Sequence, residues 1–323
     1  MTEAGKERAT SGRSAGDVRT RSGRRRRPRR GRASSAIARA GIALIALIAV
    51  SLVVPHALHA WTPGTHIYLA ESVLQNLGVL PAVTADLLHS FPYDYLYGSI
   101  AADTSFAKKY APADRHPHAW HVAQEIYDSA PADALKAFGL GYLSHLAADV
   151  IAHNHFVPRQ LVLSRGPGGV AHAYWEARVE HVLGEHYSRS AVDLIKMDHL
   201  RADQHLDTIL SPTLFSVKTN RRMFRGMVRI TEQRSFQATL RMADEYGKWA
   251  LTEEDVGRHM DRSLQQIVEV LKGKEPEVRA SDPSGYAALA RAKEVRKLAF
   301  QLGYRGNPGR VLEDAESEFG LKK

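Results

Sequence analysis

The segment from Ala137 to Phe156, AFGLGYLSHLAADVIAHNHF, constrains the fold of this chain more than any other stretch. Its many apolar residues predict a helix inside a core. His145, Asp149 and His153 recur every four residues, and at ~100° per residue they lie within ~80° of one helix face. Ionisable groups in an apolar core are costly unless something neutralises them. The segment therefore predicts a buried helix that carries ligands for a divalent metal.

The composition limits the kind of metal site that can form. The chain has 323 residues, 44% of them hydrophobic, which is enough for one large core with or without an appendage. It contains no cysteine, which excludes disulfides, thiolate zinc sites and cysteine nucleophiles. Any metal must therefore be bound through nitrogen and oxygen. Thirteen of the 16 histidines lie between positions 56 and 186, so these donors are concentrated there.

The positive charge of the chain is confined to its N-terminal arm. Residues 1–40 contain 13 Arg or Lys and 3 Asp or Glu, a net charge of +10, whereas the whole chain has +9, which leaves about −1 for the rest. A nucleic-acid-binding domain normally carries its positive charge on the folded surface. The arm, residues 1–39, has little to pack and is expected to be disordered. No stable complex with nucleic acid is expected.

A secretory signal peptide is predicted next, with its hydrophobic segment and cleavage region in residues 40–60. Residues 40–54 are uncharged and mostly apolar, and a small residue, Ala60, follows at the expected cleavage site. Cleavage there would make Trp61 the first residue of a secreted, periplasmic or cell-envelope protein. The alternative is an uncleaved anchor, although a membrane span usually needs ~20 apolar residues.

Beyond the cleavage site, the sequence predicts helix after helix without an alternating strand pattern, and hence an all-α fold. A core is predicted for residues 61–187, a C-terminal helical part of the same or an appended domain for 188–305, and a fraying polar tail for 306–323. Pro and Gly signals predict loops at 91–113 and 157–169. The predicted helices are 66–77, 81–90, 118–129, 132–153, 170–187, 203–210, 218–247, 252–272 and 283–302.

A second pair of donors supports the metal prediction. His172 and Glu176 are four residues apart, so both lie on one face of the predicted helix 170–187. One such pair arises by chance on exposed helices, and a lone histidine near a helix end is usually a surface or capping residue. Two pairs, one of them on a strongly apolar helix, favour metal binding. The donors in chain order are Trp61 with its potential free amine, His66, Asp103, one of His116, His118 and His121, His145, Asp149, His153 or His155, His172 and Glu176.

These motifs together resemble the zinc-dependent phospholipase C family, which is related to the S1/P1 nuclease fold. The resemblance begins at Trp61 and continues through GSIAAD, ending at Asp103, and through HAWH, GYLSHLAADVIAH and HAYWE, ending at Glu176. It does not extend over the C-terminal half. It implies an all-α, multi-helix bundle with additional C-terminal helices and a site for two to three Zn²⁺ ions.

The resemblance also implies a role for each donor. Asp103 would accept a proton from the attacking water and is the implied catalytic residue. Trp61 could contribute its amine only after signal removal. Glu180, one turn beyond Glu176, lies outside the set, and Glu180→Gln is expected to change little. The implied ligands are Asp103, His118, His145 and Asp149 for a first zinc ion, His153, His172 and Glu176 for a second, and Trp61, His66 and Asp149 for a third.

Two ligand positions stay open in the sequence. His116 and His121 compete with His118, because all three precede the central helix within one short segment. His153 is preferred to His155 because it continues the helical stripe that starts before it.

The resemblance implies an exported enzyme that hydrolyses phospholipid phosphodiester bonds by a zinc-bound hydroxide. The alternatives are an S1/P1-like nuclease or nucleotidase that uses the same metals, and a non-catalytic zinc-binding envelope protein. The nearly neutral body disfavours an enzyme that grips long polyanions. The expected partner is a phospholipid or another phosphoester substrate, while association with a membrane surface and the oligomeric state stay open.

Overall fold

A computed structural model describes residues 61–104, 112, 115–164, 168–210, 217–231, 251–273, 276–302 and 307–321. The predicted basic arm and signal peptide, residues 1–60, lie outside these residues. Within them, no helix has both the length and the hydropathy that crossing a membrane requires.

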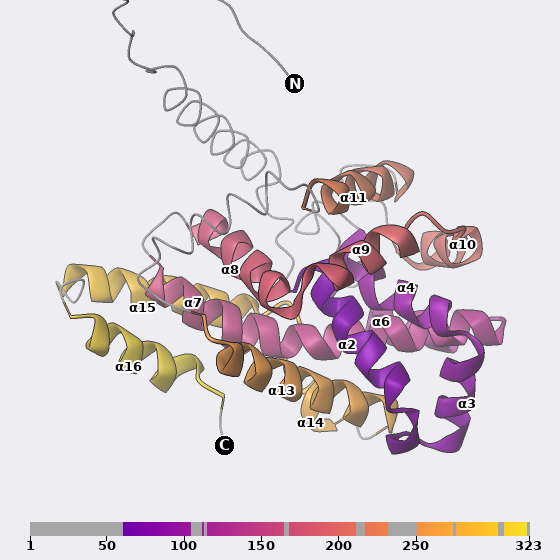
Figure 1. Cartoon of the computed structure of the whole chain (residues 1–323), viewed down its shortest axis with the longest axis horizontal. Coiled ribbons are helices and arrows are strands. Elements are labelled where there is room, and N and C mark those ends of the chain that lie inside the picture. Colours follow the sequence, from indigo (N-terminus) through magenta and orange to yellow (C-terminus); the bar gives the residue numbers. More distant parts are fainter. Residues whose placement is uncertain are drawn as a thin grey trace, which may run out of the picture. The chain divides into compact units, whose positions relative to one another are not determined.

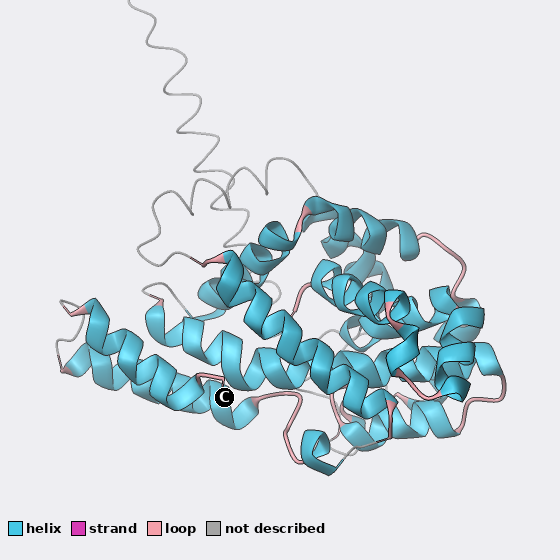
Figure 2. Ribbon diagram, turned by 60° about the horizontal axis from the view of Figure 1, so that its bottom comes forward, coloured by secondary structure: helices cyan, strands magenta, loops and turns pink. Residues whose placement is uncertain are grey.

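The described residues form helices and contain no strand, which confirms the all-α prediction (Figures 1 and 2). Among the described residues, the 3₁₀ helices η1 and η2 and the π-helix η5 interrupt the α-helices. The elements are α2 (Pro63–Gln75), η1 (Leu77–Val79), α3 (Ala82–Ser90), α4 (Pro92–Ala101), η2 (Ala102–Thr104), α5 (Trp120–Asp128), α6 (Asp133–Ile151), the π-helix η5 (Ala152–Phe156), α7 (Val157–Leu163), α8 (Gly168–Leu183), α9 (Glu185–Leu194), α10 (Leu200–Ile209), α11 (Val217–Thr231), α13 (Glu253–Leu271), α14 (Pro276–Arg279), α15 (Tyr286–Gln301) and α16 (Pro308–Phe319).

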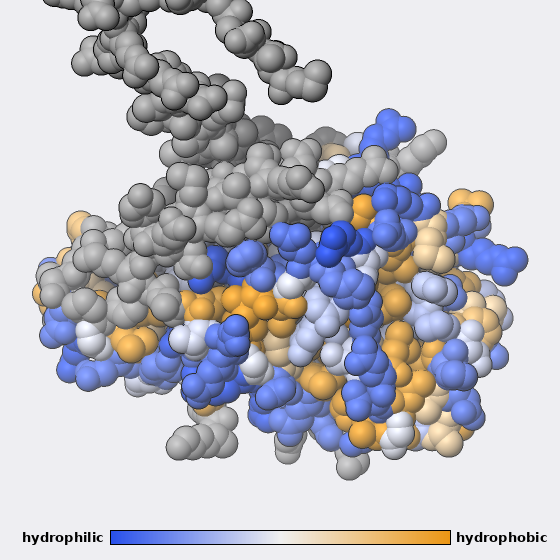
Figure 3. Space-filling model, in the orientation of Figure 1, coloured by the Kyte–Doolittle hydropathy of each residue, from blue (hydrophilic) through white to orange (hydrophobic). Residues whose placement is uncertain are grey.

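Helix α6 is the centre of the packing. Almost every residue from Leu135 to Ile151 is buried, as its apolar sequence predicts, and α4, α5 and α13 pack against it. Figure 1 shows α6 running between α4 and α13. On the face shown in Figure 3, hydrophilic residues cover most of the surface and hydrophobic residues form smaller patches between them. This is the pattern of amphipathic helices around a shared core.

Helices α4 and α6 approach each other through two glycines. A Cβ atom on Gly98 would lie 2.0 Å from the carbonyl oxygen of Phe138, and one on Gly141 would lie 2.1 Å from that of Tyr95. Only residues without a side chain allow this backbone contact. The contact fixes the course of α4, which leads directly into η2.

The structure corrects three predictions. The loop predicted at 91–113 contains α4 and η2, because Pro92 occupies the first turn of α4, where proline is tolerated. The loop predicted at 157–169 contains α7, which starts in the same way with Pro158 near its N-terminus. The tail predicted to fray forms α16, whose first turn is capped by Asn307. Part of the predicted helix 218–247 forms α11, and its remainder lies outside the described residues.

The C-terminal helices pack onto the N-terminal ones. Helix α13 contacts α6 and α2, while α15 and α16 contact α7. Arg159 on α7 pairs with Glu316 on α16, with 2.7 Å between Nε and Oε1. Residues that the family resemblance does not cover therefore help to form the surroundings of α6 and α7.

A buried histidine on α13 predicts sensitivity to acid. His259 is 5% exposed, and its Nδ1 lies 2.7 Å from the carbonyl oxygen of Asp255, to which it donates. Burial lowers the pKa of His259 to about 4. The unfolded chain, with a histidine pKa near ~6.5, therefore binds more protons between pH 6.5 and 4, so the folded state loses stability as the pH falls through this window.

We expect this residue to cost the metal-free protein about 2 kcal/mol of unfolding free energy between pH 7 and 5. In His259→Gln, which cannot be protonated, the difference between the two pH values should shrink by that amount in denaturant titrations. His89→Gln, at an exposed position on α3, is the control and should keep the wild-type difference. An unchanged pH dependence in His259→Gln would contradict the prediction.

Candidate metal centre

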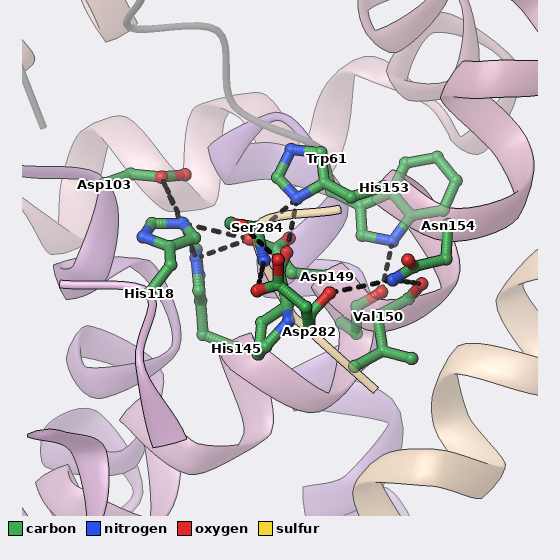
Figure 4. A network of polar contacts seen from close by, with 12 residues as sticks. Trp61, Asp103, His118, His145, Asp149, Val150, His153, Asn154, Asp282 and Ser284 are labelled. Atoms are coloured by element: carbon green, nitrogen blue, oxygen red, sulfur yellow. Dashed lines mark hydrogen bonds and ion pairs between the residues drawn. The ribbon is translucent and has the colours of Figure 1, made fainter. Parts of the chain in front are cut away.

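Six segments bring the predicted donors together. Figure 4 shows Asp103 directed toward His118, and His118 and His145 directed toward Asp149, with His153 and Trp61 close by. The donors come from the start of α2 and the residues just before it (His66 and Trp61), η2 (Asp103), the turn before α5 (His118), α6 (His145 and Asp149), η5 (His153) and α8 (His172 and Glu176). All nine residues are buried.

Asp149 is the centre of the cluster. Its Oδ1 lies 3.4 Å from Nε2 of His66, and its Oδ2 lies 3.0 Å from Nε2 of His118 and 3.2 Å from Nε2 of His145. The rings of His66 and His145 stack with their centroids 3.9 Å apart. His66, His145 and Asp149 thus form one group that could hold a metal ion.

Asp103 completes a second group with His118 and His145. Its Oδ1 lies 3.4 Å from Nε2 of His118 and 3.8 Å from Nε2 of His145. Asp103 is on η2, directly after α4, the helix that packs closely on α6 through the two glycines.

The predicted pair on α8 faces His153. Nε2 of His172 lies 2.7 Å from Oε1 of Glu176, and the rings of His172 and His153 meet edge to face with centroids 6.1 Å apart. His153 also approaches the centre of the cluster, with 4.0 Å between its Nδ1 and Oδ2 of Asp149. These three residues therefore adjoin the first two groups.

Several polar atoms at the centre are buried without a hydrogen bond of regular geometry. They include Nε2 of His66 and both carboxylate oxygens of Asp149. Such atoms are costly in a protein core. Imidazole nitrogen and carboxylate oxygen are also the donors through which zinc binds proteins that offer no thiolate. The residues present therefore fit a zinc ion.

The protonation states of the cluster also suit a metal. Burial, reinforced by the nearby His145, lowers the pKa of His66 to about 4, and burial lowers the pKa of His153 to about 4 as well. Burial alone would raise the pKa of Asp149, but the surrounding histidines His145, His118 and His66 together lower it well below its usual value. At neutral pH, His66 and His153 are thus unprotonated and Asp149 is ionised, the states in which these side chains can bind a metal.

Backbone carbonyls orient two of the imidazoles. Nδ1 of His145 lies 2.8 Å from the carbonyl oxygen of Ser99, and Nδ1 of His153 lies 2.6 Å from that of Pro283. A carbonyl can only accept, so each Nδ1 carries the proton and Nε2 is the nitrogen suited to a metal. The Pro283 contact comes from the C-terminal half, and no sequence signal identifies it.

The histidines between which the sequence left the choice open lie in different surroundings. His118 reaches the cluster, whereas His116 accepts a hydrogen bond at Nδ1 from the backbone N–H of His118 (3.1 Å), and His121 is exposed. His153 lies in the cluster, while Nδ1 of His155 lies 3.2 Å from the carbonyl oxygen of Phe319. The π-helix turns these two histidines toward different surroundings.

Trp61 is held against α6. Its side chain is fully buried, its indole Nε1 donates to the carbonyl oxygen of Ala148 (3.1 Å), and its ring lies 5.0 Å from that of Phe156. The start of α2 is therefore anchored next to the helix that carries Asp149. This anchor holds the main chain of Trp61 in the neighbourhood of the cluster.

The chain matches a known family over part of its length. Residues 65–214 match the family model described as "Zinc dependent phospholipase C". The matched segment contains eight of the nine predicted donors, all except Trp61. No curated protein and no solved structure matches the chain.

Proposed function

Because residues 65–214 place this chain in the zinc-dependent phospholipase C family, we propose that it is an exported phosphoesterase that hydrolyses the phosphodiester bond of phospholipids. The observation that carries the proposal is the buried centre in which His66, His118 and His145 converge on Asp149. The centre offers nitrogen and oxygen donors of the kind that zinc binds, and its residues lie within the segment that matches the family model.

We propose that the cluster binds two to three zinc ions. The short distances between Asp103, His118, His145 and Asp149 support a first ion held by these four residues. The proximity of His153 to the His172–Glu176 pair supports a second. The position of His66 beside Oδ1 of Asp149 supports a third, to which the main chain of Trp61 would contribute.

Zinc bound in this centre would supply a water whose pKa is lowered to ~7 and positive charge that neutralises phosphate oxygens. The protein residues orient the imidazoles and exclude bulk water. Ser99 and Pro283 hold the imidazoles of His145 and His153 in one tautomer, and burial of the cluster excludes bulk water. Asp103 lies at the edge of the cluster, 3.4 Å from His118, and is the proposed acceptor for the proton that water loses.

The substrate class is tested by loading the purified protein with zinc, quantifying the bound metal, and offering two substrates. We expect release of diacylglycerol from phosphatidylcholine vesicles and loss of this activity after treatment with a chelator. Release of nucleotides from single-stranded nucleic acid instead would favour the S1/P1-like alternative. Stoichiometric zinc without either activity would favour a non-catalytic zinc protein.

Export and membrane association are proposals that rest on the sequence. The apolar segment before Ala60 supports signal cleavage, and cleavage would free the amine of Trp61 next to the cluster. A phospholipid substrate also implies work at a membrane surface. N-terminal sequencing of the exported protein tests the first proposal, and a mature chain that starts well away from Trp61 would exclude its amine as a ligand.

A further inference from the structure

Glu180 is a buried carboxylate on α8 that the proposed ligand sets leave out. The sequence predicts that its substitution changes little, because it lies one turn beyond Glu176. In the structure, however, Glu180 is only 5% exposed. A charged group is rarely buried to this degree unless partners satisfy it.

The partners of Glu180 are at the start of α2 and on α9. The backbone N–H of Gly64 donates to its Oε2 (3.2 Å), and the buried hydroxyl of Ser188 donates to its Oε1. The carboxylate lies so close to Gly64 that a Cβ atom there would be 2.6 Å from Oε2. Both oxygens are thus engaged, and glycine is the residue that leaves room for them.

The position of this carboxylate suits the electrostatics of α2. The first backbone N–H groups of a helix lack partners within the helix, and the N-terminus attracts negative charge. Helix α2 has no acidic residue in its own first turn. Glu180 therefore supplies from α8 the negative charge that the first turn of α2 lacks.

The same turn of α2 carries one donor of the metal centre and closely follows another. His66 is two residues after Gly64, and Trp61 is three residues before it. Nε2 of His66 lies 3.4 Å from Oδ1 of Asp149, so a small displacement of the turn would separate them. The alignment of this turn decides whether His66 and Asp149 can share an ion.

We propose that Glu180 is a positioning residue for the ion bound by His66, an inference that rests on the proposed function. Glu180 holds the first turn of α2 through Gly64, and Ser188 fixes the orientation of its carboxylate. The effect on metal binding is indirect, like that of other groups that orient ligands, whose loss lowers metal affinity by about 10–100-fold.

The test compares zinc stoichiometry and affinity, measured by chelator competition on folded protein well below its melting temperature. His66→Ala should lose one ion and defines the site. Glu180→Ala should weaken the same ion by about 10-fold or more and leave the others in place. Glu180→Gln keeps an acceptor but loses the charge, so it should show a smaller loss of affinity for this ion. Ser188→Ala should also lower this affinity.

Glu254→Ala is the matched control, since Glu254 is an exposed glutamate in the first turn of α13. It should retain wild-type zinc content and affinity. Wild-type affinity for every ion in folded Glu180→Ala, or in both Glu180→Gln and Ser188→Ala if the alanine variant does not fold, would overturn the inference. Unchanged zinc content in His66→Ala would overturn it too. Absence of zinc from the wild type would instead reject the proposed function, because this assay needs no substrate.

Discussion

The variant Asp149→Asn is expected to lose at least one zinc ion per molecule and to reduce phosphodiester hydrolysis by ~100-fold or more, a larger effect than the loss of a group that only orients a ligand. Both oxygens of Asp149 face imidazole nitrogens, and the amide removes the negative charge that the cluster needs to hold cations. Metal quantification after dialysis against a fixed free zinc concentration measures the first effect. Diacylglycerol release from phosphatidylcholine vesicles measures the second.

A surface aspartate provides the control for this change. Asp193 on α9 forms an exposed pair with Lys196, a kind of contact that contributes about 0–1 kcal/mol. Asp193→Asn should keep wild-type zinc content and activity. Equal zinc content in Asp149→Asn and the wild type would rule out Asp149 as a ligand.

The second large effect is expected from Gly98→Ala or Gly141→Ala. Each new methyl group would meet a backbone carbonyl oxygen at about 2 Å, 2.0 Å for Gly98 and 2.1 Å for Gly141, so α4 and α6 would have to separate. Overpacking of this kind costs about 3 kcal/mol, which exceeds the gain of about 1 kcal/mol from replacing glycine in a helix. Denaturant titration should show the net loss, and zinc affinity should fall because Asp103 follows α4.

Gly257→Ala separates the packing effect from helix propensity. Gly257 lies inside α13, and nothing lies within 4 Å of the position that its Cβ would take. This variant should therefore be stabilised by about 0.5–1 kcal/mol. A similar gain in Gly98→Ala would show that α4 and α6 can adjust without cost.

The fold could be predicted from the sequence where the apolar pattern is strong. The central helix was expected at 132–153 and is observed as Asp133–Ile151. Helix α4 was missed because Pro92 and Gly98 look like loop signals. Their actual roles, a proline in the first turn and a glycine at a helix contact, depend on position in the helix and on a partner that is distant in sequence.

The candidate site, too, could be predicted from the sequence only where the spacing of residues along a helix carries the information. The spacing of His145, Asp149 and His153 predicted one helical stripe, and the structure brings all three to the cluster. Choosing between His153 and His155 depends on the π-helix, whose wider turn shifts the side chains that follow. The carbonyl of Pro283 could not be predicted, because a backbone acceptor has no sequence signature.

Helix α8 carries His172, Glu176 and Glu180 on three successive turns, in contact with two different parts of the centre. A shift of α8 would therefore move two things at once: the His172–Glu176 pair and the carboxylate of Glu180, which contacts α2. An ion bound at one end restrains α8 and so reduces the cost of ordering the other end. Loading of the proposed sites is therefore expected to be cooperative, and by linkage each ion would raise the affinity for the other by the same factor.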